Sequence, residues 1–269
     1  MTINYDELAL SYNKKGIPVP KREMIKNDEQ IEGIRTAGVI NTLVLDEVEK
    51  LIHVGMTTDE INTIVHNKTI ELGGIPAPLG YNGFPKSVCT SINDMVCHGI
   101  PDDTILKDGD IVNVDCTTIY KGYYADASRT FLIGKCSDEA IHLVKTTKEA
   151  LDLALANLKP YSRLRDIGFY IEGYAKRHGY SVVHEIGGHG VGVEFHEDPF
   201  IYHYGKKNTG MVLFPGMVFT IEPMINQGSR EVFLDASNNW TVYTDDGGLS
   251  AQFEYTVLIK EDGVEILAK

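Results

Sequence analysis

The chain has 269 residues, which is enough for one large domain or two small ones with a fully buried core. Its hydrophobic fraction of 43% and its charged fraction of 23% are those of an ordinary soluble globular protein. A net charge of −13 argues against nucleic acid or an anionic membrane as the main partner, because phosphate binding requires a basic surface.

The first half of the chain predicts two helices after a polar N-terminal extension. Residues 1–26 have the composition of an arm, not of a domain. Asn27 and Gln30 form a capping-box pattern that predicts a helix ending near Gly55. A second helix is predicted from Thr57 to the glycine pair at 73–74, because apolar residues follow at helical spacing.

A similar block of sequence recurs 106 residues later. In both copies a long amphipathic helix is followed by a short break and a second helix. The identity is low, so chance similarity between two helical hairpins stays an alternative. A true repeat would imply two related halves about a pseudo-twofold axis. The matching positions are Leu45-Asp46 with Leu151-Asp152, Ile61 with Ile167, and Gly73 with Gly179.

Each predicted helix pair is followed by a strand-rich region. The first runs from about Ile111 to Leu132, and the second runs from Ser181 to the C-terminus. Turn signals lie at 108–110 and 215–216. Helices followed by runs of antiparallel strands predict an α+β fold and not a parallel α/β sheet.

Two aspartates in the first strand region are expected to share one face of a hairpin. Asp115 and Asp126 flank the turn at 120–122. A hairpin with an even-numbered loop places residues of opposite parity on the same face. Two such carboxylates repel each other unless a proton or a cation lies between them. A pair of solvated edge aspartates is the alternative.

Three further residues complete a possible set of metal ligands. His189 lies in a glycine-rich run that lacks the spacing of a dinucleotide or phosphate loop, and glycines let a ligand approach the backbone. Glu222 ends an apolar strand before Pro223, and Glu254 alternates with polar residues on its strand. A half-exposed strand would also explain the two glutamates. Together with the aspartates, the five residues suggest a dinuclear metal site.

Two other histidines have the character of catalytic residues. His98 and His196 each lie in a loop next to glycine or proline, where a side chain can be aimed into a cleft. No G-x-S-x-G elbow is present, and Cys97 and His98 are adjacent in sequence, so their side chains point apart. A two-metal hydrolase therefore fits better than a covalent one.

The four cysteines and the N-terminal residues bear on the cellular location. No cysteine belongs to a C-x-x-C pair, which argues against a cysteine-rich zinc module and is typical of a reducing compartment. The N-terminus lacks the pattern of a signal peptide, and no stretch of about 18 apolar residues predicts a membrane span. We therefore expect a cytoplasmic protein.

Over about residues 27 to 268, the sequence closely resembles the type I methionine aminopeptidases of bacteria. Seven motifs in order make the likeness specific. They are Gly83-Phe84-Pro85-Lys86-Ser87-Val88-Cys89, Val96-Cys97-His98-Gly99-Ile100-Pro101, Val112-Asn113-Val114-Asp115, Gly187-Gly188-His189-Gly190, Phe195-His196-Glu197, Phe219-Thr220-Ile221-Glu222-Pro223-Met224 and Ser250-Ala251-Gln252-Phe253-Glu254.

The resemblance implies a pita-bread fold, with two pseudosymmetric halves and a curved antiparallel sheet flanked by helices. Residues 27–269 would form one catalytic domain around a dinuclear site. Asp115 and Asp126 would bind both metals, or one in bidentate fashion. His189 and Glu222 would complete one metal site, and Glu254 would bridge.

The resemblance also implies a substrate pocket and roles for the histidines. His98 and His196 match the two active-site histidines of the family. The walls of a pocket for one unbranched apolar side chain would be Tyr81, Phe84, Cys89, Phe195 and Trp240. Trp240 lies in a polar segment, where an ordinary loop anchor is the alternative. Pro78 lies at the edge of this pocket, where family members vary.

The expected reaction removes the N-terminal methionine from nascent proteins and peptides. Two cations would lower the pKa of a water between them, and Glu222 would accept its proton. His196 would stabilise the oxyanion, and His98 would bond the scissile amide or assist the leaving amine. One imidazole among oxygen ligands suits cobalt, manganese, iron or zinc.

Two alternatives stay open at the level of sequence. The first is another pita-bread metallopeptidase, an Xaa-Pro dipeptidase or aminopeptidase, although these typically carry a large N-terminal domain. The second is a non-catalytic binding protein of the same fold, although such relatives usually lose metal ligands. We expect a monomer that meets nascent chains, at the ribosome if a docking surface exists, without binding nucleic acid directly.

Overall fold

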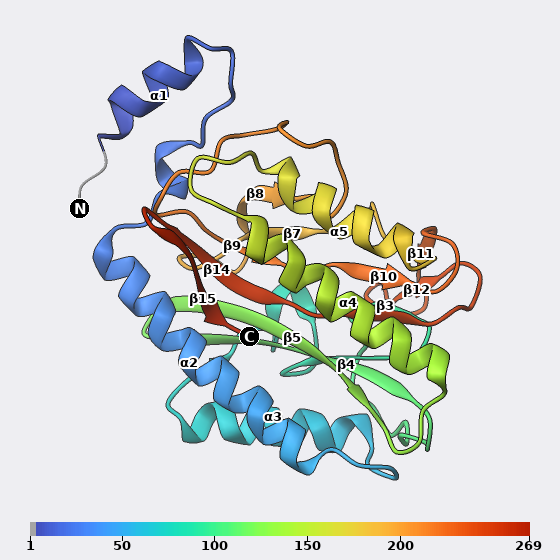
Figure 1. The fold of residues 1–269 in the computed structure, drawn as a ribbon. Coiled ribbons are helices and arrows are strands. Elements are labelled where there is room, and N and C mark those ends of the chain that lie inside the picture. The colour runs from blue at the N-terminus through green and yellow to red at the C-terminus, as the bar shows by residue number, and fades with distance from the viewer. Residues whose placement is uncertain (1–3) are drawn as a thin grey trace.

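The computed structural model describes residues 4–269 as helices packed around antiparallel strands, which is the predicted α+β class (Figure 1). Its α-helices are α1 (Tyr5–Asn13), α2 (Asp28–Leu51), α3 (Thr58–Glu71), α4 (Asp138–Asn157) and α5 (Arg165–Arg177). Two short 3₁₀ turns, η1 (Arg22–Met24) and η2 (Tyr81–Gly83), lie before α2 and before the first longer strand.

The strands form four antiparallel sheets. The first contains β1 (Ile75–Pro76), β2 (Cys89–Ile92), β4 (Ile111–Tyr120) and β5 (Tyr123–Leu132), and the second contains β6 (Ser181–Val182), β10 (Met224–Asn226) and β13 (Ser250–Gln252). The third contains β3 (Met95–Cys97), β11 (Val232–Leu234) and β12 (Val242–Thr244). The fourth contains β7 (Gly188–Gly190), β8 (Glu197–Ile201), β9 (Val218–Ile221), β14 (Tyr255–Lys260) and β15 (Gly263–Ala268).

The helix starts follow the predicted capping signals. Asn27 and Gln30 form a capping box at the start of α2, and Thr57 and Glu60 form one at the start of α3. Each box satisfies backbone N–H groups that a helix leaves without partners in its first turn.

The structure confirms the predicted repeat of the helix pair. Helices α2 and α3 end at Leu51 and Glu71, and α4 and α5 end at the matching positions 106 residues later. Gly73 and Gly179 follow the second helix of each pair with φ of 80° and 84°, a conformation that favours glycine. Strands β1 and β6 then occupy equivalent places in the two halves.

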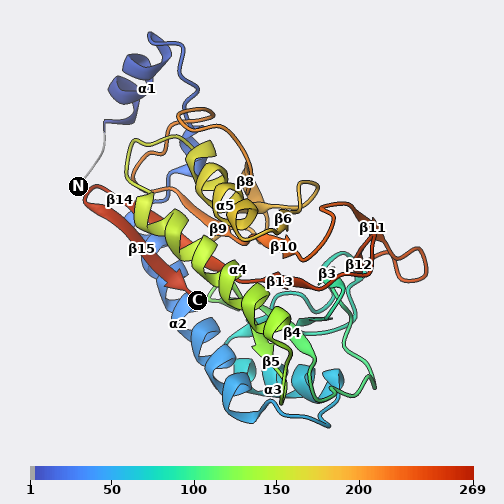
Figure 2. The ribbon, with the colours of Figure 1, turned by 45° about the vertical axis from the view of Figure 1, so that its right-hand side comes forward.

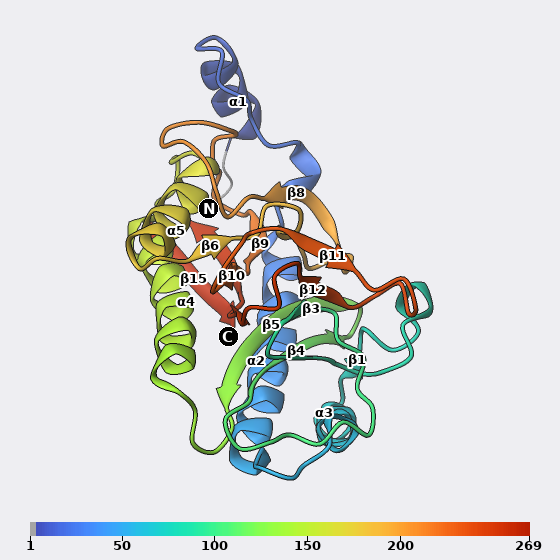
Figure 3. The same ribbon diagram turned by 90° about the vertical axis from the view of Figure 1, so that its right-hand side faces the viewer.

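Each half has its own hydrophobic core. One core joins α2 and α3 to β4 and β5 through fully buried residues such as Leu45 and Ile61. The other joins α4 and α5 to β9 and β14 through residues such as Leu143 and Phe219. Figure 3 shows α4 and α5 on one side of the strands and α3 on the other.

The two halves meet where β5 touches the segment between β13 and β14. We call this contact, made by a β-bridge between Ser128 and Glu254, the seam. Side chains extend it on both sides. Thr130 Oγ1 donates to the Gln252 carbonyl at 2.7 Å, and Thr256 Oγ1 donates to the Asp126 carbonyl at 2.7 Å. The seam therefore brings residues from both halves into one place.

The N-terminal segment contains a helix and packs on the second half. Helix α1 projects from one end of the molecule (Figure 2), yet Tyr5 and Tyr12 hold their rings within 6.2 and 5.7 Å of the Phe214 ring. The domain boundary at residue 26 stays a prediction. No helix within residues 4–269 is long and apolar enough to cross a membrane.

Candidate metal centre

The hairpin of β4 and β5 brings the two predicted aspartates together. Asp115 pairs with Ser128, and Asp126 pairs with Thr117, so the two aspartates lie diagonally on one face, in pairs two positions apart. The parity argument is thereby confirmed. Asp126 is only 4% exposed, so it is not a solvated edge aspartate.

The second half supplies the two glutamates from facing strands. The pairs Ile221–Tyr255 and Met224–Gln252 keep one register, which puts Glu222 opposite Glu254. Pro223 interrupts the ladder at this point because proline has no N–H to donate. Both glutamates are buried, at 8% and 2% exposure, which excludes a half-exposed strand.

His189 on β7 offers its Nε2 atom to the carboxylates. Its Nδ1 lies 2.9 Å from the Gly190 carbonyl, which can only accept, so Nδ1 carries the hydrogen. Nε2 then lies 3.8 Å from Asp126 Oδ2 and 3.7 Å from Glu222 Oε1. The flanking Gly188 is needed because a Cβ there would lie 2.4 Å from the Thr220 carbonyl oxygen.

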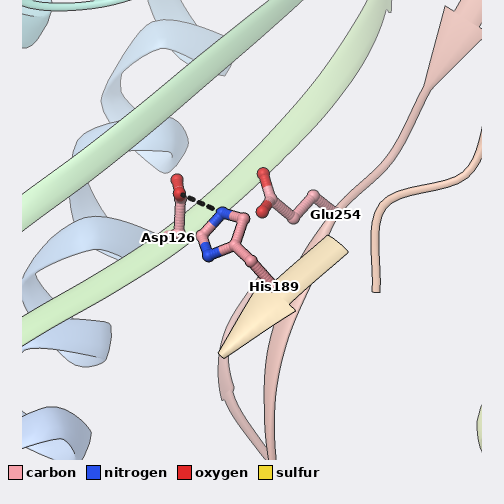
Figure 4. A group of neighbouring side chains, drawn as sticks. All are labelled: Asp126, His189 and Glu254. Atoms are coloured by element: carbon pink, nitrogen blue, oxygen red, sulfur yellow. Dashed lines mark ion pairs between the residues drawn. The ribbon is translucent and has the colours of Figure 1, made fainter. Parts of the chain in front are cut away.

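Figure 4 shows Asp126, His189 and Glu254 pointing toward a common centre from different strands. One ligand atom from each lies within 4.8 Å of the others. Asp115 lines the same pocket as this group, and Glu222 Oε1 lies 3.7 Å from His189 Nε2. The predicted five residues are thus brought together at the seam.

The four carboxyl groups have raised pKa values because they are removed from water and have no basic partner within the described residues. Burial raises the pKa of Asp115 to about 7 and that of Glu222 to about 8. Burial and the neighbouring carboxylates raise the pKa of Asp126 and Glu254 well above its usual range. Among residues 4–269, no lysine or arginine forms an ion pair with these four. The group therefore needs protons or cations.

The donor set fits divalent metal ions. Four carboxylates and one neutral imidazole are ligands that such ions accept, and burial lowers the pKa of His189 to about 3, which keeps the ring neutral. Neighbouring side chains orient the ligands. Thr117 donates to Asp126 Oδ1 at 2.8 Å, Thr220 donates to Glu222 Oε1 at 2.7 Å, and Gln252 donates to Glu222 Oε2 at 3.3 Å.

A pocket of about 550 Å³ opens onto the centre. Every residue predicted for the site lies in its lining, although their individual roles stay a prediction. These residues are Tyr81, Phe84, Cys89, His98, Asp115, Asp126, His189, Phe195, His196, Glu222, Trp240 and Glu254.

The two loop histidines lie in this pocket as neutral rings. His98 follows β3 in a left-handed conformation with φ of 57°, and burial, with His196 nearby, lowers its pKa to about 4. Burial also lowers the pKa of His196. The Tyr81 hydroxyl lies 2.9 Å from His196 Nδ1, and the His196 ring lies 4.2 Å from the His189 ring.

Aromatic side chains form the pocket walls beside the histidines. The Phe84 and Trp240 rings meet edge to face at 5.1 Å, and the Tyr81 and Phe195 rings lie 4.6 Å apart. Trp240 also lies 6.5 Å from the His98 ring, so it is part of the pocket and not only a loop anchor.

Sequence reasoning missed residues whose partners are distant in the chain. His203 is fully buried, and its Nε2 accepts the Glu222 backbone N–H at 3.1 Å. Gln252 and Thr256 looked like a polar outer face, but both are buried in the seam. Alternation along residues 252–256 correctly groups them with Glu254, yet it cannot tell a solvent face from a second packed sheet.

Comparisons with known proteins agree with the geometry. Residues 32–261 match the model of metallopeptidase family M24. Methionine aminopeptidase A of Synechocystis sp. is 50% identical over 239 residues, which cover 88% of this chain and 94% of the relative. The crystal structure of methionine aminopeptidase from Rickettsia prowazekii aligns with a TM-score of 0.89 and 43% identity, over 91% of this chain and 99% of that one.

The rival family is structurally related but more distant. Prolidase from Pyrococcus furiosus aligns with a TM-score of 0.70 and 28% identity, over 91% of this chain and 65% of that one. The shared architecture confirms the predicted pita-bread fold, and the higher identities favour the methionine aminopeptidases. The chain therefore belongs to metallopeptidase family M24, as a hydrolase of its methionine aminopeptidase group.

Proposed function

We propose that this enzyme binds two divalent cations and hydrolyses the first peptide bond of chains that begin with methionine. The ligands are Asp115, Asp126, His189, Glu222 and Glu254. The observation that supports this most is the buried group of four carboxylates around His189 Nε2, at the floor of a pocket with aromatic walls.

The metal ions would activate a water molecule and polarise the scissile carbonyl. Glu222 is the residue that takes up the proton of this water. Its two carboxylate oxygens accept hydrogen bonds from Thr220 and Gln252, which hold it in place. Burial raises its pKa to about 8 in the metal-free protein, and bound cations would restore the charged form that can accept a proton.

His196 is the donor to the oxyanion that develops on the carbonyl oxygen. When the Tyr81 hydroxyl donates to His196 Nδ1, the ring carries its hydrogen on Nε2 and can donate it to the substrate. His98, which lines the same pocket beside Trp240, hydrogen-bonds the scissile amide or assists the leaving amine.

The pocket walls select the first side chain of the substrate. Tyr81, Phe84, Phe195 and Trp240 present rings that suit a flexible thioether, because sulfur–aromatic contacts are favourable. Cys89 is buried beside Asp115 on the neighbouring strand and narrows the same pocket.

We further infer that the substrates are nascent chains in the cytoplasm and that the enzyme acts as a monomer, at the ribosome if it docks there. The likeness to bacterial methionine aminopeptidases and the net charge of −13, which disfavours direct binding to nucleic acid, support this view.

The test compares two classes of peptide. The chelated protein is reconstituted separately with cobalt, manganese, iron and zinc, and its turnover of Met-Gly-Ser is compared with that of an Xaa-Pro peptide. We expect release of methionine with at least one metal and little cleavage of Xaa-Pro. Cleavage of Xaa-Pro without cleavage of Met-Gly-Ser would reject the proposed function.

A further inference from the structure

A buried lysine from the N-terminal segment reaches the loop that carries His196. Lys26 immediately precedes the N-cap of α2, and its side chain is 2% exposed. Its Nζ forms an ion pair with Glu197, the residue that follows His196. An ammonium group buried to this extent needs such a partner, because burial removes its hydration.

Glu197 uses its other carboxylate oxygen to close the same loop. Oε1 accepts the backbone N–H groups of Val193 at 2.7 Å and Glu194 at 3.0 Å. This loop connects β7 to β8 and ends in Phe195 and His196. One carboxylate therefore shapes the loop and ties it to Lys26.

The backbone of Lys26 is fixed to the strand that leads to Glu222. Its N–H donates to the Gly216 carbonyl at 2.8 Å, and Ile25 forms a β-bridge with Met217, just before β9. Lys26 thus connects the strand that presents Glu222 with the loop that presents His196.

Lys26 itself lies outside the substrate pocket. Glu197 lines the pocket of the metal centre, whereas Lys26 lines a neighbouring cavity of about 730 Å³. Any effect of Lys26 on the reaction must therefore pass through the loop and not through direct contact with substrate.

We propose that Lys26 is a positioning residue that sets the place of His196 relative to Glu222. The inference rests on the proposed role of His196 as oxyanion donor. A shift of about 1 Å in a group that acts on the transition state can reduce the rate about 10²-fold.

The first test removes the ion pair in two ways. Lys26→Met leaves the half-buried Glu197 charge without its partner, so this variant is expected to lose stability as well as activity. The paired variant Lys26→Met with Glu197→Gln has no lone charge, and the glutamine oxygen can still accept the Val193 and Glu194 N–H groups. We expect this pair to melt near the wild-type temperature while kcat on Met-Gly-Ser falls at least about tenfold.

The matched control is Lys21→Met in the same segment. Lys21 pairs with Asp198 at 2.9 Å, next to Glu197 in sequence, but its side chain is 61% exposed. Exposed pairs of this kind contribute little, so we expect kcat within about twofold of wild type.

The second test asks whether Lys26 acts through His196. The paired variant is made again in a His196→Ala background. We expect its effect on kcat to shrink to about twofold or less, since the group that it positions is gone. A merely structural role would lower kcat equally in both backgrounds.

Each failure has a distinct signature. A fully active paired variant beside an active wild type would overturn the role of Lys26 alone, as would an undiminished effect in the His196→Ala background. A metal-loaded wild type that cannot cleave Met-Gly-Ser would instead overturn the proposed function and, with it, the role given to His196.

Discussion

At the scale of single residues, protonation of the four carboxylates favours folding of the metal-free protein but opposes metal binding. Asp126, Glu222 and Glu254 are buried and Asp115 is half-buried, and each has a raised pKa because burial disfavours its charged form. Protons can neutralise the group when metal is absent, and cations must displace those protons to bind. The centre therefore couples pH, metal affinity and stability.

The first prediction concerns the metal-free protein between pH 7 and pH 9. A carboxyl with a raised folded-state pKa stabilises the fold below its unfolded pKa, and this stability is lost as the pH rises through the folded value. The folded-state pKa of Glu222 is about 8. The folded-state pKa values of Asp126 and Glu254 are raised well above their usual range. The histidines are already neutral there, because burial lowers the pKa of His98 and His189.

We therefore expect the stability of the chelated protein to fall by about 1 kcal/mol or more per pH unit across this window, measured by denaturant unfolding. The paired variant Asp115→Asn with Glu222→Gln should show a flatter profile. A chelated wild-type protein that becomes more stable from pH 7 to pH 9 would contradict the electrostatic account.

The second prediction concerns His196. Replacing it with alanine should lower kcat on Met-Gly-Ser by about 10²- to 10³-fold, because one oxyanion donor is lost. Metal affinity, measured by calorimetric titration, should stay within a few-fold, since His196 is not among the five ligands. His142→Ala on α4, far from the pocket lining, serves as the control and should keep full activity. Unchanged kcat in His196→Ala would remove this residue from the mechanism.

Sequence alone could predict these residues where the signal is local. The pairing of Asp115 with Asp126 follows from hairpin parity, and the glycines around His189 indicate close backbone approach. His203 and Lys26 could not be assigned, because their partners lie 19 and 171 positions away in the chain. Nothing in the local pattern distinguishes a buried lysine with a distant partner from an exposed one.

At the scale of elements, the seam between the halves depends on side chains instead of a continuous backbone ladder. The bridge between Ser128 and Glu254 joins β5 to the second half by backbone pairing, and the Tyr124 N–H donates to the Gly192 carbonyl at 2.9 Å. Thr256 Oγ1 both donates to the Asp126 carbonyl and accepts its N–H, at 2.7 and 3.0 Å. One hydroxyl thus replaces two ladder hydrogen bonds beside a metal ligand.

The third prediction follows from this hydroxyl. Thr256→Val keeps the shape of the fully buried side chain but leaves the Asp126 N–H and carbonyl without partners. We expect a loss of about 1–3 kcal/mol in unfolding free energy and weaker metal binding. Thr63→Val on the exposed face of α3 is the control and should change stability by less than about 0.5 kcal/mol. Equal effects of the two substitutions would mean that the seam does not depend on Thr256.

The helices could be predicted from the sequence because their signals are local. The division of the strands among the sheets could not be predicted. Capping boxes mark the starts of α2 and α3. The sequence after Ser181 predicts one continuous strand region, but its strands belong to different sheets. Pro223 has no N–H to donate to the ladder, and Glu254 forms a β-bridge with Ser128 of β5. Those breaks place Glu222 and Glu254 at the centre.

At the scale of the whole molecule, the metal centre lies between two halves that have separate cores. The proposed ligands come from both halves: Asp115 and Asp126 from the first, and His189, Glu222 and Glu254 from the second. Cations held by these five residues would link the halves and stabilise only the folded state.

The fourth prediction is that metal raises the stability of both halves at once. At a free metal concentration of about 100 times Kd, one site should add about 2.7 kcal/mol to the unfolding free energy. Amide hydrogen exchange in α2 reports on the first half, and exchange in α4 reports on the second. Protection that rises in only one half on metal addition would mean that the ligands do not link the halves.

The most direct measurement is a titration of the chelated wild-type protein with manganese or cobalt that records bound metal and methionine release from Met-Gly-Ser together. We predict up to two ions per chain, no turnover before metal is added, and turnover that rises with occupancy. Asp126→Ala and His189→Ala should lose both binding and turnover. Full turnover by the metal-free protein, or by either variant, would contradict the assignment of the five buried residues as the metal centre of this aminopeptidase.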